Sequence, residues 1–396
     1  MSKPLEGIGV VDLTRVLSGP YCTMMLADMG ADVIKIEIPG KGDDTRQWGP
    51  PFINGESAYF LSINRNKKSL TLDLSKKEGK ETLRALIAKN DVVVENFRNG
   101  VMGRLGFGYD EIKKINPRAI HCAISGFGRT GPDADRPGYD VMVQAEGGVM
   151  SLTGEPDGLP MKVGVSEADI TAGLLALNGI LLALIARGKS GRGQFVDIGM
   201  LDGQVAILTY QAGIYFATGE SPPRLGSKHP TIAPYEPVLT KDGYIILAVG
   251  NDSLWQRFCK LVKREGLITD ERFATNAQRV SNHDVLLKIV EEIMQAHGKK
   301  EWLELLKENG VPCGDIRSVK EVCTYPHVLA REMVVELSHP TAGNIKVTGV
   351  PIKLSATPGA VETPPPTLGQ HNEEILSSRL GFSREKIAQL EKDGVI

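Results

Sequence analysis

Cysteine is scarce in this sequence, and its positions suit neither a disulfide framework nor a metal site. The 396 residues include five cysteines, none of them in a Cys-x-x-Cys pair: Cys22, Cys122, Cys259, Cys313 and Cys323. A small, odd number without paired spacing is typical of a reducing compartment, and it offers no ligand set for structural zinc. We therefore expect a cytoplasmic protein with neither disulfides nor a bound metal.

An excess of one charge is lacking as well. Lysine and arginine number 46, and aspartate and glutamate number 48, so the formal net charge is −2. A protein that binds nucleic acid through its phosphates carries a basic excess, so we expect no nucleic-acid partner. No apolar stretch follows residues 1–6, as a signal peptide would require. The apolar run 170–186 falls short of the ~20 residues of a membrane span, which predicts a buried core helix and no membrane partner.

Several common active-site motifs are missing. The sequence contains no HxxxH or HExxH zinc motif, no GxSxG nucleophile elbow and no GxxxxGK[ST] phosphate loop. The turn at 14–20, where a nucleotide fold would begin its first helix, lacks the GxGxxG dinucleotide fingerprint. Glu37 ends the next expected strand, where a ribose-binding acid would lie. Without the glycines this placement is weak, and a dehydrogenase is the least supported enzyme class.

Short apolar runs alternate with helical segments over the first 200 residues. This alternation predicts βαβ units and a mostly parallel sheet, in an α/β fold whose ligands bind beyond the carboxyl ends of the strands. Helices are expected at 21–30 and 77–89, and strands at 9–13, 31–37, 69–74, 91–96, 118–125 and 194–199.

The composition changes at residues 221–226, which contain two prolines and a glycine. Beyond this point the sequence predicts a smaller α+β domain over 221–330, with a strand at 241–250 and helices at 253–266, 282–297 and 300–309. Three consecutive prolines in 361–366 predict an extended linker. The tail from 374 to 392 has a helical pattern.

Two groups of basic residues follow or precede expected strands. One is 64–68 (NRNKK), and the other contains Arg98 and Arg104. Such residues are most often scattered surface charges. Two groups in loops at strand ends would also suit a polyphosphate ligand held without a metal.

Two aspartates begin helical segments. Asp140 precedes a helical stretch at 141–146, and Asp169 begins the long apolar helix. The simplest interpretation of each is a helix cap. The alternative is chemical, because a carboxylate at the start of a buried helix is held ionised by the positive helix end and, when partly desolvated, can attack an acyl carbon.

The chain resembles the class III CoA-transferases, the family that includes formyl-CoA transferase, carnitine CoA-transferase and α-methylacyl-CoA racemase. The resemblance covers nearly all of the 396 residues, and no single motif decides it. Its carriers are VVDLTRVLSGPYCTMMLADMGADVIKIE (10–37), NRNKKSLTLDL (64–74), DVVVENFRNGVMGRLG (91–106), GYDVMVQAEGG (138–148), SEADITAG (166–173), GKSGRGQFVDIGMLDG (188–203) and PTLGQHNEEIL (366–376).

This resemblance implies both an architecture and a reaction. The architecture is a Rossmann-like large domain built from both chain ends (1–220 and the return segment 331–396), a small α+β domain (221–330) and an interlocked homodimer. The reaction is CoA transfer from an acyl-CoA donor, with succinyl-CoA the favoured candidate, to a carboxylic acid. It proceeds through an aspartyl mixed anhydride and an enzyme–CoA thioester on Asp169. CoA and acyl-CoA are substrates, and no prosthetic group is needed.

The resemblance also assigns site residues. Tyr139 stands where the racemase branch has a catalytic histidine, and since tyrosine is a poor base at neutral pH, this favours a transferase. Asp140 fills the position of a second acidic residue. The CoA contacts carry over as Val16, Leu17, Ser18, Leu72, Asn96, Phe97 and Arg104.

Three departures from the family pattern leave alternatives open. Leu17 and Ile38 replace a glutamine and an arginine of some relatives, which leaves the CoA phosphates to Arg46, Lys67, Lys68, Arg98 or Arg136. A covering run of four glycines is missing, and 250–252 is a shorter candidate. A loop at 226–230 could supply a cation for a second carboxylate of the acceptor, or simply be solvated. An acyl-CoA racemase and a non-catalytic CoA-binding protein remain alternatives.

Overall fold

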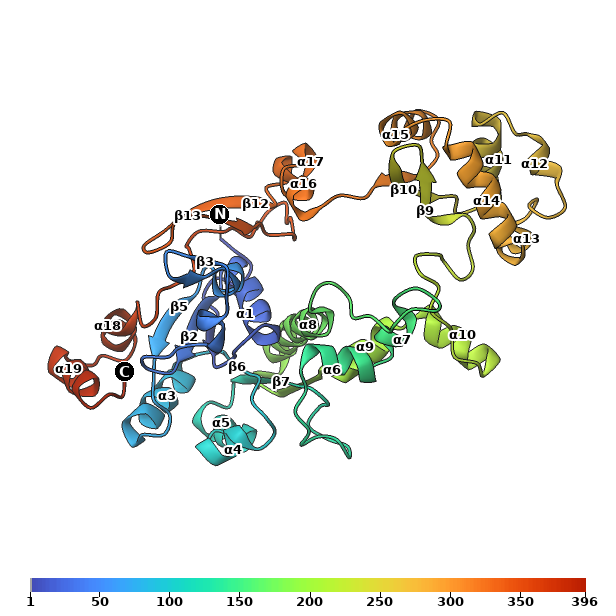
Figure 1. Cartoon of the computed structure of the whole chain (residues 1–396). Helices are drawn as coiled ribbons and strands as arrows, with labels where there is room; N and C mark the ends of the chain where they lie inside the picture. Colours follow the sequence, from blue (N-terminus) through green and yellow to red (C-terminus); the bar gives the residue numbers. More distant parts are fainter. Residues whose placement is uncertain (1) are drawn as a thin grey trace. The chain divides into compact units, whose positions relative to one another are not determined.

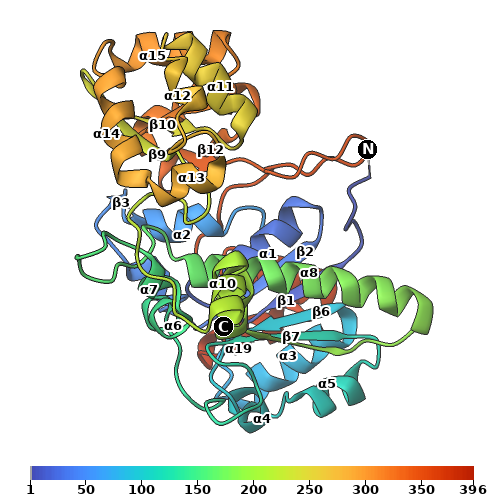
Figure 2. The ribbon, with the colours of Figure 1, turned by 90° about the vertical axis from the view of Figure 1, so that its right-hand side faces the viewer.

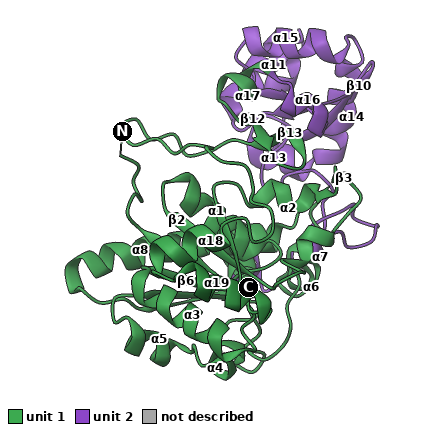
Figure 3. Ribbon diagram, turned by 90° about the vertical axis from the view of Figure 1, so that its left-hand side faces the viewer, with its two compact units in different colours: residues 1–149, 162–213, 326–396 green, residues 150–161, 214–325 purple. Residues whose placement is uncertain are grey.

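The computed structural model describes residues 2–396, which divide into two compact units (Figures 1 and 3). The first unit contains the residues up to 149, together with 162–213 and 326–396, and the second contains 150–161 and 214–325. The sequence-based boundaries after residues 220 and 330 lie near these changes. The segment 150–161, which we had placed in the large domain, belongs instead to the second unit.

A six-stranded sheet forms the centre of the first unit, and every neighbouring pair in it is parallel. Numbered along the chain within this sheet, the strand order is 3-2-1-4-5-6, which places the topological switch point between β1 and β6. The predicted parallel α/β fold is therefore confirmed. From edge to edge the strands are β5 (Lys68–Thr71), β2 (Asp32–Glu37), β1 (Gly9–Asp12), β6 (Val92–Glu95), β7 (Ile120–Ser125) and β8 (Phe195–Gly199).

Helices cover both faces of this sheet. On one face lie α1 (Ser18–Asp28) and α8 (Glu167–Ser190), which Figure 2 shows running alongside each other. On the other lie α3 (Lys77–Lys89), α5 (Tyr109–Ile115) and C-terminal segments. Because successive strand residues point to opposite faces, Val10 packs in the first core and Val11 in the second.

Helix α8 is only partly a core helix. Ala168, Ala172 and Ala176 are buried, whereas Leu182 and Ile185 are 66% and 63% exposed. By length and composition alone this is a helix that could cross a membrane. The expectation of a fully buried helix is therefore wrong for this single chain, because one side of α8 has no cover within it.

The return segment completes the first unit. It brings a β-hairpin, an extended stretch over 361–366 and three short helical pieces. The tail predicted as one helix is interrupted because Gly381, with φ of 70°, takes a left-handed conformation that ends the helical turn before it. The elements are β12 (Val334–His339), β13 (Gly343–Thr348), α18 (Asn372–Glu374), the π-helical turn η2 (Ile375–Arg379) and α19 (Arg384–Lys392).

The second unit has its own core, in which Trp255 and Phe258 are fully buried. A three-stranded antiparallel sheet, with β10 in the centre, packs against amphipathic helices. Its elements are β9 (Tyr235–Thr240), β10 (Gly243–Ala248), β11 (Cys313–Asp315), α11 (Asp252–Leu261), α12 (Gly266–Thr269), α13 (Asn276–Ser281), α14 (His283–Met294), α15 (Lys299–Glu308) and α16 (Val319–Cys323).

The remaining elements are short and connect these layers. They are η1 (Asp44–Gln47), β3 (Phe52–Ile53), β4 (Glu56–Ser57), α2 (Ala58–Ile63), α4 (Val101–Leu105), α6 (Asp140–Glu146), α7 (Val149–Leu152), α9 (Met200–Ile207), α10 (Tyr210–Thr218) and α17 (Pro326–Ala330).

A buried ion pair joins the end of α1 to the loop before β5, and the same loop bonds to the return segment. The guanidinium of Arg65 donates to both carboxylate oxygens of Asp28, at 3.0 and 2.7 Å. Asn66 donates to Asp28 and to the carbonyl of Ala360, both at 2.8 Å. Burial raises the pKa of Asp28 even though Arg65 lies beside it, so desolvation outweighs the attraction between the two charges.

We predict that Arg65→Met lowers the free energy of unfolding by about 3–5 kcal/mol, because the buried Asp28 carboxylate then has no opposite charge beside it and keeps only the hydrogen bond from Asn66. The double variant Asp28→Leu, Arg65→Met should lose less, since no buried charge remains. Urea denaturation measures both, with the exposed Arg192→Met as control. A loss of less than about 1 kcal/mol in the single variant, the range of a surface pair, would contradict this role.

Candidate functional site

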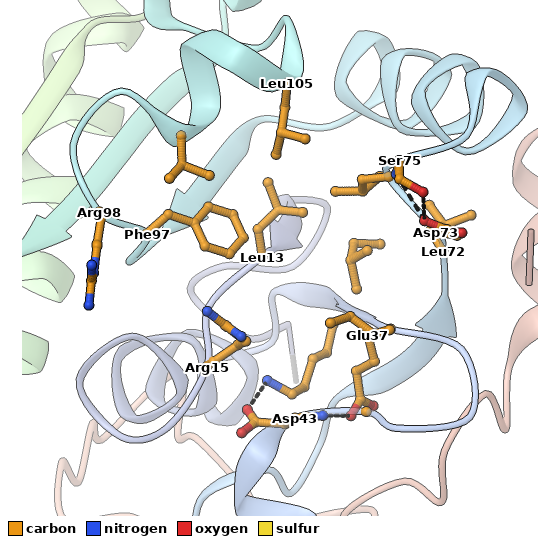
Figure 4. A pocket seen from close by; sticks show the side chains of 16 residues that line it. Leu13, Arg15, Glu37, Asp43, Leu72, Asp73, Ser75, Phe97, Arg98 and Leu105 are labelled. Carbon is orange, nitrogen blue, oxygen red and sulfur yellow. Dashed lines mark hydrogen bonds and ion pairs between the residues drawn. The ribbon is translucent and has the colours of Figure 1, made fainter.

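Two adjoining cavities open at the carboxyl edge of the sheet, at the switch point between β1 and β6. Both are lined by Arg15, Phe97 and Arg98. The first, of about 460 Å³, is mainly apolar, and Figure 4 shows the ring of Phe97 beside Leu13 with Arg15 at one side. Leu72 and Leu105 also line it. This cavity can receive a flat apolar group such as a purine.

The second cavity, of about 200 Å³, is polar. It contains both aspartates singled out in the sequence, Asp140 and Asp169, together with Tyr139. Of the other predicted contacts, Val16, Ser18, Asn96 and Arg136 line it. An elongated ligand could therefore extend from the first cavity past Arg98 to Asp169.

Buried charges fix the loop that follows β1. Val16 has φ of 69°, an uncommon conformation for a β-branched residue, and its N–H donates to Asp43 at 3.2 Å. Asp43 also accepts from Lys35 at 2.8 Å, and Lys35 donates to the carbonyl of Thr14 at 2.8 Å. The Lys35 and Asp43 side chains are fully buried, so each satisfies the other's charge.

Asn96 joins this loop to the one that follows β6. Its side chain accepts from the N–H of Arg15 at 2.9 Å and donates to the Arg15 carbonyl at 2.7 Å. The two loops that line both cavities are therefore linked by a pair of hydrogen bonds across the switch point.

The carboxylate of Asp169 lies where two helices begin. Asp169 is in the first turn of α8, and Ser18, in the first turn of α1, hydrogen-bonds to it through both its hydroxyl and its N–H. The helices approach closely because residue 173 is glycine: a Cβ there would lie 2.7 Å from the Ser18 carbonyl oxygen. Both helix N-termini favour a negative charge at this point.

Asp140 does not cap its own helix, α6. One of its oxygens accepts from the N–H groups of Ala168, at 2.9 Å, and Asp169, at 3.4 Å, while Gln144 donates to the other at 2.8 Å. Asp140 is thus the first residue of α6 but caps α8. Asp169 itself lies two residues into α8 from Glu167, so the simple cap interpretation is wrong for both aspartates.

The environment of Asp169 raises its pKa to about 7. Burial is the main cause and the negative charge of Asp140 adds to it, while the Ser18 hydrogen bonds act in the opposite direction. A carboxylate with this pKa is partly ionised at neutral pH and poorly solvated. It can therefore act as a nucleophile towards an acyl carbon.

Tyr59, which sequence reasoning did not identify, lines neither cavity but lies close enough to both aspartates for their charges to act on it. Burial and then the charges of Asp169 and Asp140 raise its pKa to about 12, so the phenol stays protonated as a hydrogen-bond donor. Tyr59 lies in α2, edge-on to Trp48 at 5.2 Å between ring centroids. Tyr59 could not be found from the sequence, because no residue spacing indicates that α2 lies near α8.

Several predicted phosphate contacts are engaged elsewhere. Arg46 donates twice to Glu37, at 2.7 Å each, and Lys67 is buried against Asp12 at 3.1 Å. Lys68 pairs with Asp32 and Glu374. Those predictions are therefore wrong, because all three side chains already neutralise carboxylates.

Arg98 and Arg136 remain at the cavities. Arg136 pairs with Glu146, whereas Arg98 has no ion pair within residues 2–396. Leu17 packs with Met24 and Ile63 and lines neither cavity, and neither does Arg104. The loops at 226–230 and 250–252 belong to the second unit.

A GxGxxG pattern does occur at 126–131, after β7. It leads into a loop rather than a helix, so it does not form the dinucleotide fingerprint. Within residues 2–396, no three His, Cys, Asp or Glu side chains gather as a metal-binding group.

The chain belongs to CoA-transferase family III, whose family model matches residues 5–372. The mixed α/β fold with a parallel central sheet matches that of a solved family member, as the resemblance predicted. The protein is therefore an enzyme that transfers CoA from an acyl-CoA to a carboxylic acid.

Characterised relatives are similar over nearly the whole chain. Succinyl-CoA:glutarate CoA-transferase of Mus musculus is 43% identical over 394 residues, which cover 100% of this chain and 90% of the relative. Succinate–glutarate CoA-transferase of Agrobacterium fabrum is 44% identical, covering 94% and 95%. The crystal structure of a CAIB/BAIF family protein from Brucella suis superimposes with a TM-score of 0.86 at 42% identity, covering 96% of this chain and all of that one.

We predict that kcat/KM for the acyl-CoA rises with pH and levels off above about 7, because only the ionised Asp169 is nucleophilic. Asp140→Asn should move this inflection to lower pH. The variant removes the negative charge but keeps an oxygen that can accept from Ala168. Rates measured from pH 5 to 9 test this, with the exposed Asp135→Asn as control. An inflection that stays in place or moves upward in Asp140→Asn would contradict the electrostatic explanation.

Proposed function

We propose that this CoA-transferase moves CoA from succinyl-CoA to a dicarboxylic acid of similar length, such as glutarate, with Asp169 as the covalent carrier. The observation that carries the proposal is the Asp169 carboxylate, held by Ser18 in a polar cavity that adjoins an apolar one. The names of the relatives from Mus musculus and Agrobacterium fabrum support this substrate pair.

The reaction begins with two exchanges at the same carboxylate. An oxygen of Asp169 attacks the thioester carbonyl of succinyl-CoA, the C–S bond breaks, and CoA leaves as a thiolate, which leaves an aspartyl–succinyl anhydride. The thiolate then attacks the aspartyl carbonyl of this anhydride. Succinate departs, and CoA is bound to Asp169 as a thioester.

The acceptor reverses these two exchanges. Its carboxylate attacks the aspartyl thioester, releasing CoA thiolate and forming a second mixed anhydride. The thiolate attacks the acceptor's carbonyl, which yields the new acyl-CoA and restores the Asp169 carboxylate. No proton or electron has to be supplied from outside the two substrates.

The protein contributes position and charge stabilisation. The apolar cavity holds the adenine end of CoA, Arg98 lies at the phosphates, and the thioester reaches Asp169. The N–H of Ser18 and the phenol of Tyr59 donate to oxygens that become negative in each tetrahedral intermediate. Asp140, through the N–H groups of Ala168 and Asp169, keeps the first turn of α8 in place.

We predict that succinyl-CoA leaves a covalent adduct on the wild-type protein, detected as a mass increase of the intact chain. Hydroxylamine should remove it, because anhydrides and thioesters react with this nucleophile. Asp169→Ala should show no adduct, whereas Asp157→Ala, an exposed aspartate of the second unit, should label like wild type. Glutarate added with succinyl-CoA should give glutaryl-CoA.

Other outcomes identify the alternatives. CoA binding without an adduct from any donor would contradict the transferase mechanism and support a binding protein. Exchange of the α-proton of a branched acyl-CoA with solvent deuterium would support a racemase. Glutaryl-CoA formation by Asp169→Ala at the wild-type rate would contradict the role of Asp169.

We also propose that the protein is an interlocked homodimer in the cytoplasm. Its support is the family resemblance and the uncovered apolar side of α8 and α9, where Leu174, Leu182, Ile185 and Val205 are 41–66% exposed. A patch of this kind on a single chain is typical of a protein interface. An interlocked dimer would cover it with a second copy.

We predict that light scattering gives twice the mass of the chain. Leu182→Glu with Ile185→Glu should lower the soluble yield or the measured mass, because charges would be buried at the interface. Lys189→Glu, an exposed change on the same helix, is the control. A wild-type protein that is monomeric at micromolar concentration would contradict the proposal.

A further inference from the structure

The strand that leads into the CoA-binding loop ends in a buried carboxylate. Glu95 is the last residue of β6 and is 1% exposed. One of its oxygens accepts from the N–H of Phe97 at 2.7 Å, and the other accepts from Arg129. Glu95 therefore connects the end of the sheet directly to the loop at 96–99.

Arg129 reaches the same loop from the segment after β7. Besides Glu95, its guanidinium donates to the carbonyl of Phe97 at 3.3 Å and to the side chain of Asn99 at 3.4 Å. Its own N–H donates to Asp197 at 3.0 Å, which fixes the backbone from which the side chain extends. One planar guanidinium thus connects the strand end and two points of the loop, which a lysine could not do.

Neither Glu95 nor Arg129 lines either cavity, whereas Asn96, Phe97, Arg98 and Asn99 line the polar one. We propose that Glu95 and Arg129 are a positioning pair that fixes the 96–99 loop and thereby sets the affinity for CoA without contacting it. The inference rests on the proposed placement of CoA along Phe97 and Arg98.

The groups around Glu95 make this pair sensitive to pH. Burial raises the pKa of Glu95 to about 7, Arg129 opposes this, and Asp197 adds to it. His121 faces Glu95 from β7 at 3.8 Å, but burial and the charge of Arg129 lower its pKa to about 4, so it stays neutral. As the pH falls through about 7, Glu95 takes up a proton and loses its attraction for Arg129.

Calorimetric titration with CoA and steady-state kinetics with succinyl-CoA test the pair. Arg129→Met should raise the Kd for CoA and the KM for succinyl-CoA about tenfold, the value of one hydrogen bond to a charged group. The kcat should change less than about threefold, because Asp169 and its partners are untouched. Arg129→Lys should recover part of the affinity, and Arg192→Met is the surface control.

A second variant separates positioning from stability. Arg129→Met leaves Glu95 buried and unpaired, so it lowers the thermal midpoint. Glu95→Gln with Arg129→Met removes both charges and should recover much of the midpoint while CoA binding stays weak. The wild type should lose CoA affinity between pH 7.5 and 6 as Glu95 takes up a proton, and Glu95→Gln alone should reduce this loss.

The Arg98→Met variant distinguishes a failure of the positioning pair from a failure of the proposed CoA site. If it weakens CoA binding while Arg129→Met stays within about twofold of wild type, the positioning pair is overturned and the proposed CoA site stands. If Arg98→Met leaves the Kd unchanged as well, CoA lies elsewhere and both proposals fall. A lower kcat at unchanged KM in Arg129→Met would also overturn the positioning role.

Discussion

The active site depends on the meeting of two helix N-termini at one carboxylate. The first turn of α1 packs closely against α8 at Gly173, and Ser18 hydrogen-bonds to Asp169. The positive helix ends and the Ser18 hydrogen bonds favour the ionised form, whereas burial and Asp140 oppose it. These opposing effects give Asp169 a pKa of about 7, so that in the proposed mechanism it is neither a permanent, weakly nucleophilic anion nor an inert acid.

A pair of buried opposite charges, Lys35 and Asp43, lines the apolar cavity and shapes the loop after β1. Lys35 lies within β2 and Asp43 in the loop that follows it, and both side chains are fully buried. Because each neutralises the other, their polar groups can be buried and can hold the unusual backbone at Val16. The loop after β1 is thus held by the Lys35–Asp43 pair, and two hydrogen bonds of Asn96 link it to the loop after β6.

Much of the fold could be predicted, because its causes are local. Apolar runs specified the six parallel strands, and a glycine ended the first helix. The predicted site residues came from the family resemblance. Their contacts could not be predicted, because these contacts join distant parts of the chain. Asp140 caps a helix that begins 27 residues later, and Tyr59 approaches Asp169 from α2. Lys67 failed as a phosphate contact because its partner, Asp12, lies 55 residues away.

The position of the C-terminus has a consequence for the order in which the molecule can fold. Ile375, Leu376 and Ile387 lie in the core on the α3 side of the sheet, and Arg46 donates to the carbonyl of Pro366 at 3.1 Å. During synthesis, the first unit therefore lacks part of its core until residues 375–387 have left the ribosome. The second unit is complete by residue 325, so its core around Trp255 can form while the first unit still lacks its last segment. The unit whose residues are made first can thus complete its core only after the second unit has been made.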